Sequence, residues 1–329
     1  MDRRRALGIG LVLVAGASFA SGSIFATLSY RLGVGWLTLL QWRFVVGAGL
    51  AWLWVLSSPR RRAAARGMPA GQIGAALVLG VVYSGNAGTY YAGLESIPAA
   101  LAGVLVYVYP VFVAILSLRF ATRLDGRRPW IALGLAIVGV VLALGGLDLG
   151  RPVPAGGLLL VLASAAIYSV WIVASARLSG ERQDRLGSEA PAADPTARDA
   201  AVTTAVMMTS TALMLALLGI ATGRPIDPQI VPGAAWPWLL GIGFVASFVA
   251  IQALYAGARR IGAAQAALIS TSEPLFIVGL AAILLGQTLA PIQLLGAGLI
   301  LVAVVVAQTS PRPTPASRSI RGMEAEAEA

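Results

Sequence analysis

Two charged side chains lie deep inside long apolar stretches of this sequence. Arg43 lies in the stretch 36–56, and Glu273 lies near the middle of the stretch 264–285. A charge at the centre of a membrane-spanning helix costs at least about 2.5–3.5 kcal/mol, so each side chain is expected to face the protein interior or a wet cavity. Desolvation favours a neutral carboxyl group, whereas a nearby Arg43 or a cationic ligand favours a charged one. Glu273 can therefore act as a proton carrier, and the alternative is a static contact of Arg43 with Glu273 or with the backbone.

Two prolines interrupt apolar stretches beside these charges. Pro110 and Pro274 donate no backbone hydrogen bond, so they leave the carbonyl groups of Val106 and Ser270 free. Lipid cannot satisfy such a carbonyl group, whereas a ligand, water or a hydroxyl group can. Both helices are therefore expected to be kinked and to line the centre of the protein, unless the kinks serve packing alone.

Polar and aromatic side chains recur at helical spacing in the same stretches. Tyr83, Asn86 and Tyr90 share one face of a helix, and Gln252 and Tyr255 form a similar face. The residues expected to line a cavity and contact a ligand are Tyr83, Asn86, Tyr90, Tyr109, Trp171, Gln252, Tyr255, Ser270 and Glu273, with Tyr168 completing the wall. Arg43, Pro110 and Pro274 are expected to have structural or gating roles.

The composition places these residues in a membrane protein. Hydrophobic residues make up 58% of the sequence and charged residues 12%, whereas soluble domains are roughly 45–50% apolar. A soluble fold cannot bury so many apolar side chains, but helices in a bilayer can expose them to lipid. Because His and Cys are absent, imidazole bases, thiol nucleophiles and disulfides are excluded, and we expect no metal site and no cofactor.

Ten apolar stretches are long enough to cross a hydrocarbon core about 30 Å thick. They are predicted at 7–28, 36–56, 72–94, 98–118, 130–147, 156–178, 201–222, 235–258, 264–285 and 291–308. The first stretch also has features of a cleaved secretory signal, but its apolar character continues past Ala20. The predicted fold class is therefore an all-α polytopic membrane protein with ten transmembrane helices.

Arginines alternate between the predicted loops. Clusters follow the second, fourth, sixth and eighth stretches, and the opposite loops hold only Arg31, Arg151 and Arg224. Because cytoplasmic loops retain basic residues, both termini are predicted to be cytoplasmic in a bacterial inner membrane. This placement explains the net charge of +10 without nucleic acid as a partner. The loop 179–199 is predicted to be mobile, and the tail 309–329 to be disordered.

The sequence also repeats internally. A shift of 164 positions places the segment 91–93 on 255–257, Pro110 on Pro274 and Tyr109 on Glu273. Each unit holds five predicted spans, an odd number, so the second unit enters the membrane from the opposite face. The predicted organisation is two inverted five-helix repeats, 6–147 and 148–308, followed by the tail.

Several motifs resemble those of the drug/metabolite transporter superfamily, specifically the ten-helix EamA-type transporters, over residues 6–308. They are Trp42-Arg43-Phe44, Tyr90-Tyr91-Ala92-Gly93-Leu94, Pro110-Val111-Phe112, and Glu273-Pro274-Leu275-Phe276 followed by Leu285-Gly286-Gln287. The resemblance implies export of a small metabolite through a cavity between the halves, driven by proton or metabolite gradients. The segment 272–274 is similar to the amino-acid-exporting branch. Gln287 departs from the Glu that family members commonly have there.

The sequence thus predicts a secondary transporter, an exporter of a small metabolite such as an amino acid, that works by alternating access with proton coupling at Glu273. Its expected partners are this small-molecule substrate and the surrounding lipid. A non-transporting scaffold or sensor is one alternative. A membrane-embedded enzyme is a second, disfavoured because the predicted loops lack clustered carboxylates or a nucleophile with its base. We do not expect an enzyme.

Overall fold

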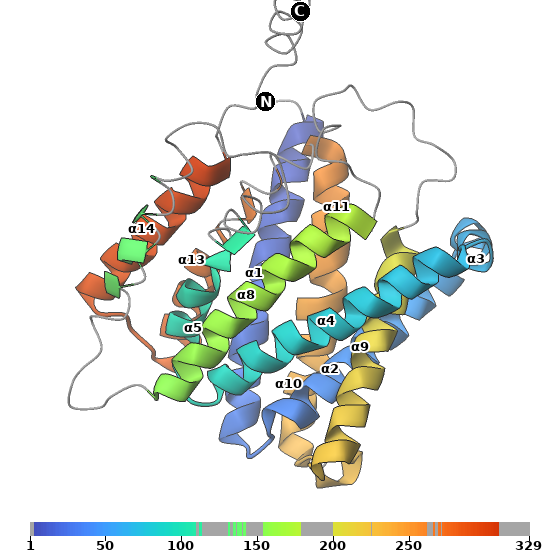
Figure 1. Ribbon diagram of the computed structural model, residues 1–329, viewed down its shortest axis with the longest axis horizontal. Helices are drawn as coiled ribbons and strands as arrows, with labels where there is room; N and C mark the ends of the chain where they lie inside the picture. The colour runs from blue at the N-terminus through green and yellow to red at the C-terminus, as the bar shows by residue number, and fades with distance from the viewer. Residues whose placement is uncertain are drawn as a thin grey trace, which may run out of the picture.

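The computed structural model describes residues 3–109, 112–113, 154–178, 200–224, 226–261 and 272–308, with isolated positions within 131–142 and 266–270. Every regular element of this described part is a helix (Figure 1). Pro110, the loop 179–199, the tail 309–329 and most of the span 130–147 lie outside it, and so do the predictions made for them.

The first half of the chain holds α1 (Arg3–Arg31), α2 (Trp36–Leu56), α3 (Pro59–Arg66), α4 (Ala70–Leu94) and α5 (Ala99–Val106). The second half holds α8 (Ala155–Leu178), α9 (Ala200–Thr222), α10 (Trp236–Gly241), η4 (Ile242–Val249), α11 (Ala250–Ile261), α13 (Glu273–Leu285) and α14 (Pro291–Gln308). The segment η4 is a π-helix, and it joins α10 and α11 into one long element. Two short 3₁₀ turns, Pro228–Ile230 and Gly233–Ala235, precede α10.

Five of the described helices are long and apolar enough to cross a membrane: Arg3–Arg31, Trp36–Leu56, Ala155–Ile172, Ala201–Thr222 and Gly233–Ala258. A sixth is added if α3 and α4 count as one span, although they are bent by 97° at their junction. The segments Glu273–Leu285 and Pro291–Ala303 are shorter apolar helices. The all-α membrane architecture is confirmed, and the number of ten spans stays a prediction.

The span predicted at 98–118 is not one continuous helix. Its first part, α5, ends at Val106, and a turn follows at Tyr107 and Val108. The turn is tight, because the backbone N–H of Tyr107 donates to Val104 at 3.2 Å and that of Val108 donates to Leu105 at 3.1 Å. The helical conformation resumes at Tyr109.

The span predicted at 264–285 is interrupted in the same way. A turn at Ser272, whose N–H donates to the Ile269 carbonyl oxygen at 3.0 Å, precedes α13. Pro274 therefore lies in the first turn of α13, where an N–H has no helical partner, and not in a helix interior. The predicted kink at Pro274 is wrong, because the helix is broken before the proline. The two breaks lie at positions related by the shift of 164 residues.

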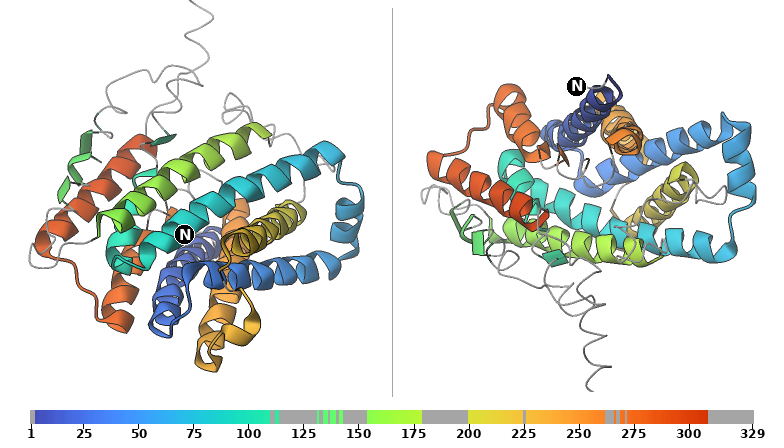
Figure 2. Two further views of the ribbon diagram at one scale, coloured as in Figure 1. Left: turned by 60° about the horizontal axis from the view of Figure 1, so that its bottom comes forward. Right: turned by 90° about the horizontal axis from the view of Figure 1, so that it is seen from above.

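Helices of the two halves pack in matched pairs (Figures 1 and 2). Three pairs of contacts correspond to each other. The contact of α1 with α11 corresponds to that of α8 with α4, and the contact of α2 with η4 corresponds to that of α9 with α4. The contact of α1 with α13 corresponds to that of α8 with α5. Two further contacts, α2 with α9 and α5 with α13, join equivalent helices directly. Each half therefore presents the same set of helices to the other.

Glycines allow the closest of these crossings. A Cβ atom at Gly257 would lie 2.6 Å from Val12 and 2.9 Å from the Gly8 carbonyl oxygen, and one at Gly93 would lie 2.8 Å from the Gly157 carbonyl oxygen. Only glycine fits such an approach of two backbones. The α1–α11 and α4–α8 crossings thus both depend on a glycine that lets two backbones approach closely.

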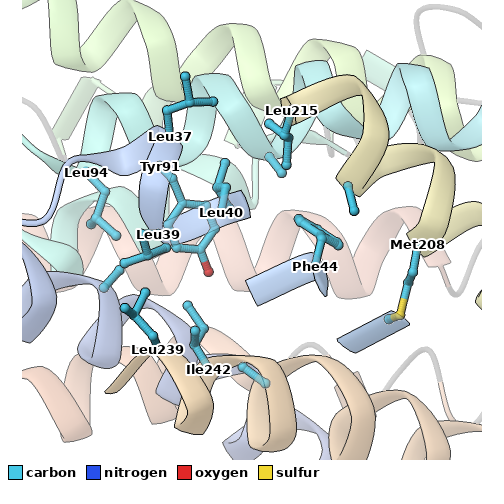
Figure 3. Close-up of a cluster of buried hydrophobic side chains, with 14 of the residues drawn as sticks. Leu37, Leu39, Leu40, Phe44, Tyr91, Leu94, Met208, Leu215, Leu239 and Ile242 are labelled. Carbon is cyan, nitrogen blue, oxygen red and sulfur yellow. The ribbon is translucent and has the colours of Figure 1, made fainter. Parts of the chain in front are cut away.

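A buried apolar cluster lies where α2, α4, α9 and α10 meet (Figure 3). Phe44 is 1% exposed and Tyr91 is 6% exposed, and both belong to this cluster. The cluster fixes the part of α2 that carries Arg43, because Phe44 is the next residue along the helix.

The two ends of the bundle differ in charge. The Trp36 end, where 32–35, 95–98, 223–224, 226–235 and 286–290 lie between helices, carries Arg31, Glu95, Arg224 and Asp227. At the opposite end, the start of α1 packs against the end of α11, and α3 follows α2. This basic end carries the arginines at 3–5, 60–62, 66 and 260, with no acidic residue among its described positions.

Candidate functional site

Arg43 is a buried guanidinium group between α2, α4 and the π-helix η4. Its exposed fraction is 7%. Its Nε donates to Ser247 Oγ at 2.9 Å, and its Nη1 donates to the Tyr91 hydroxyl. The guanidinium carbon also lies 5.2 Å from the ring centroid of Phe44 and 5.1 Å from that of Tyr91. All these neighbours are neutral, and they hold the cation through hydroxyl oxygens and ring faces.

Ser247 reaches Arg43 from within the π-helix. Its hydroxyl accepts the Arg43 hydrogen bond and itself donates to the carbonyl oxygen of Ile242, five residues earlier, at 3.3 Å. The wider turn of a π-helix leaves room for such a side chain, and such segments are frequent at functional sites. The local backbone geometry of η4 thus positions one partner of the buried cation.

Glu273 lies in the first turn of α13, on the far side of the second helix break. Its Oε2 accepts a hydrogen bond from the Tyr107 hydroxyl at 2.8 Å, and this hydroxyl oxygen also lies 3.3 Å from the Ser270 carbonyl oxygen. A helix N-terminus favours a nearby negative charge. Tyr107 thus lies beside both the Glu273 carboxylate and the carbonyl group of Ser270, which precedes the helix break.

Arg43 and Glu273 do not form an ion pair with each other. The groups interact electrostatically, but Arg43 bonds to Tyr91 and Ser247, and Glu273 bonds to Tyr107. A static contact between the two charges, which the sequence left open, is therefore not found.

A row of aromatic rings connects the surroundings of the two charges. Neighbouring ring centroids are 4.9–5.9 Å apart along the row Tyr107, Tyr109, Tyr168, Trp171, Tyr83 and Phe44. Tyr168 and Trp171 are stacked, with 10° between their ring planes. The indole Nε1 of Trp171 is buried and donates to no acceptor within the described residues. The row begins at the partner of Glu273 and ends beside Arg43.

The residues predicted from the sequence occupy several places around this row. Tyr83, Tyr109 and Trp171 belong to the row itself. Asn86 Oδ1 accepts a hydrogen bond from Ser164 of α8 at 2.7 Å, and the Tyr90 hydroxyl lies 2.8 Å from Ser23 Oγ of α1. The shared face of α4 is thus divided, because Tyr83 and Asn86 contact α8 whereas Tyr90 contacts α1.

Three other predicted positions, Ser270, Gln252 and Tyr255, do not belong to the row. Ser270 Oγ donates to the Ala266 carbonyl oxygen at 2.9 Å, so only its backbone reaches Tyr107. Tyr255 is 40% exposed and interacts electrostatically with Tyr168. Neither Gln252 nor Tyr255 has a hydrogen bond or ring contact within the described part of the chain, so their role in lining a cavity stays a prediction.

Comparison with known proteins identifies the chain. The model of the EamA-like transporter family matches residues 6–145 and 155–309. The chain belongs to the EamA-like transporter family. The resemblance seen in the motifs is thereby confirmed, and the match covers both halves of the chain.

Relatives of this EamA-like protein include two curated bacterial proteins. The uncharacterized transporter YcbK of Bacillus subtilis is 26% identical over 308 residues, which are 90% of this chain and 91% of the relative. The uncharacterized transporter sll1319 of Synechocystis sp. is 25% identical over 224 residues, 66% of this chain and 60% of the relative. A solved crystal structure aligns with a TM-score of 0.59 at 21% identity, covering 91% of this chain and 96% of that one. This last likeness concerns the fold alone.

The EamA-like chain uses three site residues that the sequence prediction did not include: Tyr91, Tyr107 and Ser247. In a continuous helix Tyr107 would lie about 200° around the axis from Tyr109, on the opposite face. The turn at 107–108 removes that constraint, and the two rings lie 5.8 Å apart. Pro110 was the signal in the sequence for an interruption of this helix, but it did not show that the interruption lies at 107–108.

Side chains also join the two halves of the EamA-like bundle at the Trp36 end. Gln287 Oε1 accepts a hydrogen bond from the Ala100 N–H in the first turn of α5 at 3.4 Å. Arg31 Nη2 donates to the Leu285 carbonyl oxygen at the end of α13 at 3.3 Å. Both contacts satisfy helix termini that would otherwise lack a partner.

Proposed function

We propose that this EamA-like protein is a secondary transporter that exports a small metabolite, such as an amino acid, by alternating access. The observation that carries the proposal is the pair of helix breaks, at Tyr107–Val108 and at Ser272, in equivalent helices that pack against each other. Discontinuous helices at a repeat interface form transporter substrate sites, because their free backbone groups and helix ends face a ligand instead of lipid.

The matched helix pairs support two inverted repeats, 6–147 and 148–308, as the moving parts. Since each half presents the same helices to the other, the halves can exchange conformations. The exchange would open a central cavity first at one end of the bundle and then at the other. The cavity walls would come from the aromatic row and the two broken helices.

Glu273 is the proposed proton-coupling residue. Among the described residues of the membrane-spanning helices, it is the single carboxyl group. It interacts electrostatically with Arg43 of α2, with Tyr90 and Tyr91 of α4, with Tyr107 and Tyr109 after α5, and with Tyr168 of α8. A conformational change that alters its contact with water or with these groups alters its proton affinity. Proton uptake in one state and release in the other would couple proton flow to transport.

The charge difference between the two ends supports an orientation. The basic end would face the cytoplasm of a bacterial inner membrane, because basic residues are retained on that side. Both chain termini would then be cytoplasmic, and export would carry substrate from the basic end to the Trp36 end.

The substitution Glu273→Gln tests the coupling, because it keeps the shape and hydrogen bonding of the side chain but cannot titrate. We expect the variant to insert and to unfold thermally like the wild type. In vesicles loaded with radiolabelled L-amino acids, its flux should no longer respond to an imposed pH gradient. Glu95→Gln at the Trp36 end is the matched control and should keep the wild-type pH response. Wild-type flux with unchanged pH dependence in Glu273→Gln would overturn the coupling role.

A further inference from the structure

The connection between α2 and α4 contains a short, strongly basic helix. This helix, α3 (Pro59–Arg66), has eight residues, of which four are arginines and none is acidic. It is bent by 97° from α4. Figure 1 shows α3 at the edge of the bundle, at the right of the view. Because α4 runs across the membrane and α3 is nearly perpendicular to it, α3 lies along the membrane surface at the basic end.

One face of α3 is fixed to the protein. Ala64 and Ala65 are partly buried against the apolar cluster of α2, α4, α9 and α10. The Arg61 guanidinium carbon lies 4.2 Å from the ring centroid of Trp54, at the end of α2. Arg61 Nε donates to the Trp54 carbonyl oxygen at 2.9 Å, and its Nη2 donates to Ser57 Oγ at 3.2 Å. Arg61 thus satisfies a carbonyl group in the last turn of α2 and sets the orientation of α3.

The other arginines of α3 are exposed. The side chains of Arg60, Arg62 and Arg66 form no hydrogen bond and no ion pair with another described residue. Arg62 and Arg66 are four positions apart, so they are neighbours on the helix surface, where like charges destabilise a helix. No acidic residue is present among the described positions of the basic end. An anion bound to this face would therefore remove a repulsion that the described residues leave uncompensated.

The equivalent connection of the second half shows that the scaffold does not need this charge. The segment 223–235 joins α9 to α10 at the Trp36 end, and it forms two 3₁₀ turns in place of a basic helix. Its charged residues are Arg224 and Asp227, whose charges cancel. Because the two halves pack alike with and without a basic connection, the arginines of α3 point to a partner at the basic end.

The residues beside α3 show that this partner is the lipid headgroup layer. Leu53 is 65% exposed and Leu56 is 55% exposed, and Trp54 between them is 41% exposed. Apolar residues exposed at the end of a span contact acyl chains, and tryptophan is enriched at the level of the headgroups. The exposed face of α3 has no large apolar side chain, so α3 does not insert among the acyl chains. Its exposed arginines instead lie at the level of the lipid phosphates, which guanidinium groups bind with two hydrogen bonds.

We propose that the exposed face of α3, formed by Arg60, Arg62 and Arg66, binds the phosphate groups of anionic phospholipids in the leaflet at the basic end. Such lipids carry a net negative charge, whereas the ammonium group of a zwitterionic lipid cancels that of its phosphate. Since α3 joins α2, which carries Arg43, to α4, which carries Tyr91, bound lipid would fix the ends of both helices. The inference concerns lipid binding and holds whether or not the protein transports a solute.

Native mass spectrometry of the purified full-length protein in non-ionic detergent tests the proposal. The protein is mixed with equal amounts of phosphatidylglycerol and phosphatidylcholine that carry the same acyl chains, and the ratio of the two bound lipids is measured. We expect the wild type to prefer phosphatidylglycerol at least about tenfold, because several arginines contribute to the attraction. The preference should fall as the salt concentration rises.

Variants locate the site. Combined Arg60→Gln, Arg62→Gln and Arg66→Gln should remove most of the preference, at least about fivefold of it. Lysine at the same three positions keeps the charge without the fork and should retain part of the preference. Combined Arg3→Gln, Arg4→Gln and Arg5→Gln removes the same charge from the start of α1, at the same end, and is the matched control. It should keep the wild-type preference.

Thermal unfolding separates lipid binding from a structural role of the arginines. Because Arg60, Arg62 and Arg66 contact no other described side chain, the glutamine variant should unfold like the wild type in lipid-free detergent. Added phosphatidylglycerol should raise the unfolding temperature of the wild type and of the α1 control more than that of this variant. An equal rise in all three proteins would contradict binding at α3.

Four other results would overturn the proposal. The first is the absence of any preference for phosphatidylglycerol in the wild type. The second is an equal loss of preference in the α3 variant and the α1 control, which would indicate a general attraction to basic residues. The third is displacement of phosphatidylglycerol by an equal concentration of inorganic phosphate, which would indicate a site for a soluble anion. The fourth is a preference that arises only after Glu324, Glu326 and Glu328 are changed to Gln, which would show that the acidic end of the chain occupies α3.

Discussion

The helix α4 and its counterpart in the second half, α10–η4–α11, make equivalent contacts at two crossings, but the number of residues between the two crossings differs. At one crossing, Gly80 packs against the carbonyl oxygen of Met207, and Gly243 packs against that of Arg43. At the other crossing, Gly93 and Gly257 pack against the carbonyl oxygens of Gly157 and Gly8. The two glycines are 13 positions apart in α4 and 14 positions apart in its counterpart.

The π-helix η4 accommodates the additional residue. In a regular α-helix, one more residue would rotate everything that follows by about 100° and misplace the second crossing. The wider π turn, at Ile242–Val249, absorbs the residue between the two glycines. Packing between the halves is therefore preserved at both ends of the insertion.

The insertion also gives equivalent serines in the two halves different hydrogen-bond partners. Ser247 in η4 bonds to Arg43, whereas its counterpart Ser84 donates to the Val81 carbonyl oxygen of its own helix at 2.6 Å. The scaffold is thus close to symmetric, but the charged site is not. The difference is concentrated where a π-helix places one hydroxyl beside a buried cation.

Paired deletions should produce the largest effect. Removing Val81 from α4 rotates the following residues by about 100°, so we expect the protein not to fold. Removing Phe244 from η4 gives its two crossing glycines the same spacing as the two in α4. We therefore expect a folded protein in which Ser247 no longer reaches Arg43 and transport is lost. Detergent-solubilised size-exclusion profiles and vesicle flux distinguish these outcomes. Full transport after removal of Phe244 would mean that the π-helix has no functional role.

The glycine crossings should be similarly sensitive in both halves. Gly93→Val and Gly257→Val each place a side chain against a facing backbone, so each should lower the free energy of unfolding by about 3 kcal/mol, the upper end of typical overpacking costs. Gly10→Val, which has nothing within 4 Å of its added Cβ, is the control and should cost less than about 1 kcal/mol. Thermal unfolding in detergent measures the effects. A large inequality between the first two variants would contradict the matched packing of the halves.

The two equivalent serines should differ in importance. Ser247→Ala removes a hydrogen bond to a buried charge and should lower the free energy of unfolding by about 2 kcal/mol, whereas Ser84→Ala should cost about 1 kcal/mol. Thermal unfolding measures the loss of stability in each serine variant, alone and in combination with Arg43→Lys, so that the two losses can be compared. Equal losses for the two serines would show that Ser247 contributes nothing to holding Arg43.

The smallest effect is expected at Gln287. Gln287→Ala removes an acceptor from the first turn of α5 at a partly exposed position and should cost about 0.5–1 kcal/mol. Gln287→Glu keeps an acceptor and adds a charge that a helix N-terminus favours, so it should be neutral or slightly stabilising. Thermal unfolding again measures both. A Glu variant less stable than the Ala variant would contradict the capping role.

The sequence by itself determined the class of the protein, because its apolar residues exceed what a soluble fold can bury. It also determined the repeat and the two deep charges, since both are properties of residue order alone. The family match confirms the resemblance that rested on the motifs at 42–44, 90–94, 110–112, 273–276 and 285–287.

Only the tertiary structure decided which side chains hold the charges. The sequence predicted regular spans kinked only at Pro110 and Pro274, in which a period of 3.6 residues assigns Tyr107 and Tyr109 to opposite faces, and it did not single out Ser247. The turn at 107–108, the break at Ser272 and the π-helix at Ile242–Val249 each change that period locally. At the second break, the Tyr107 hydroxyl of the first half lies 3.3 Å from the Ser270 carbonyl oxygen of the second half, and such a contact cannot be read from the periodicity of one helix.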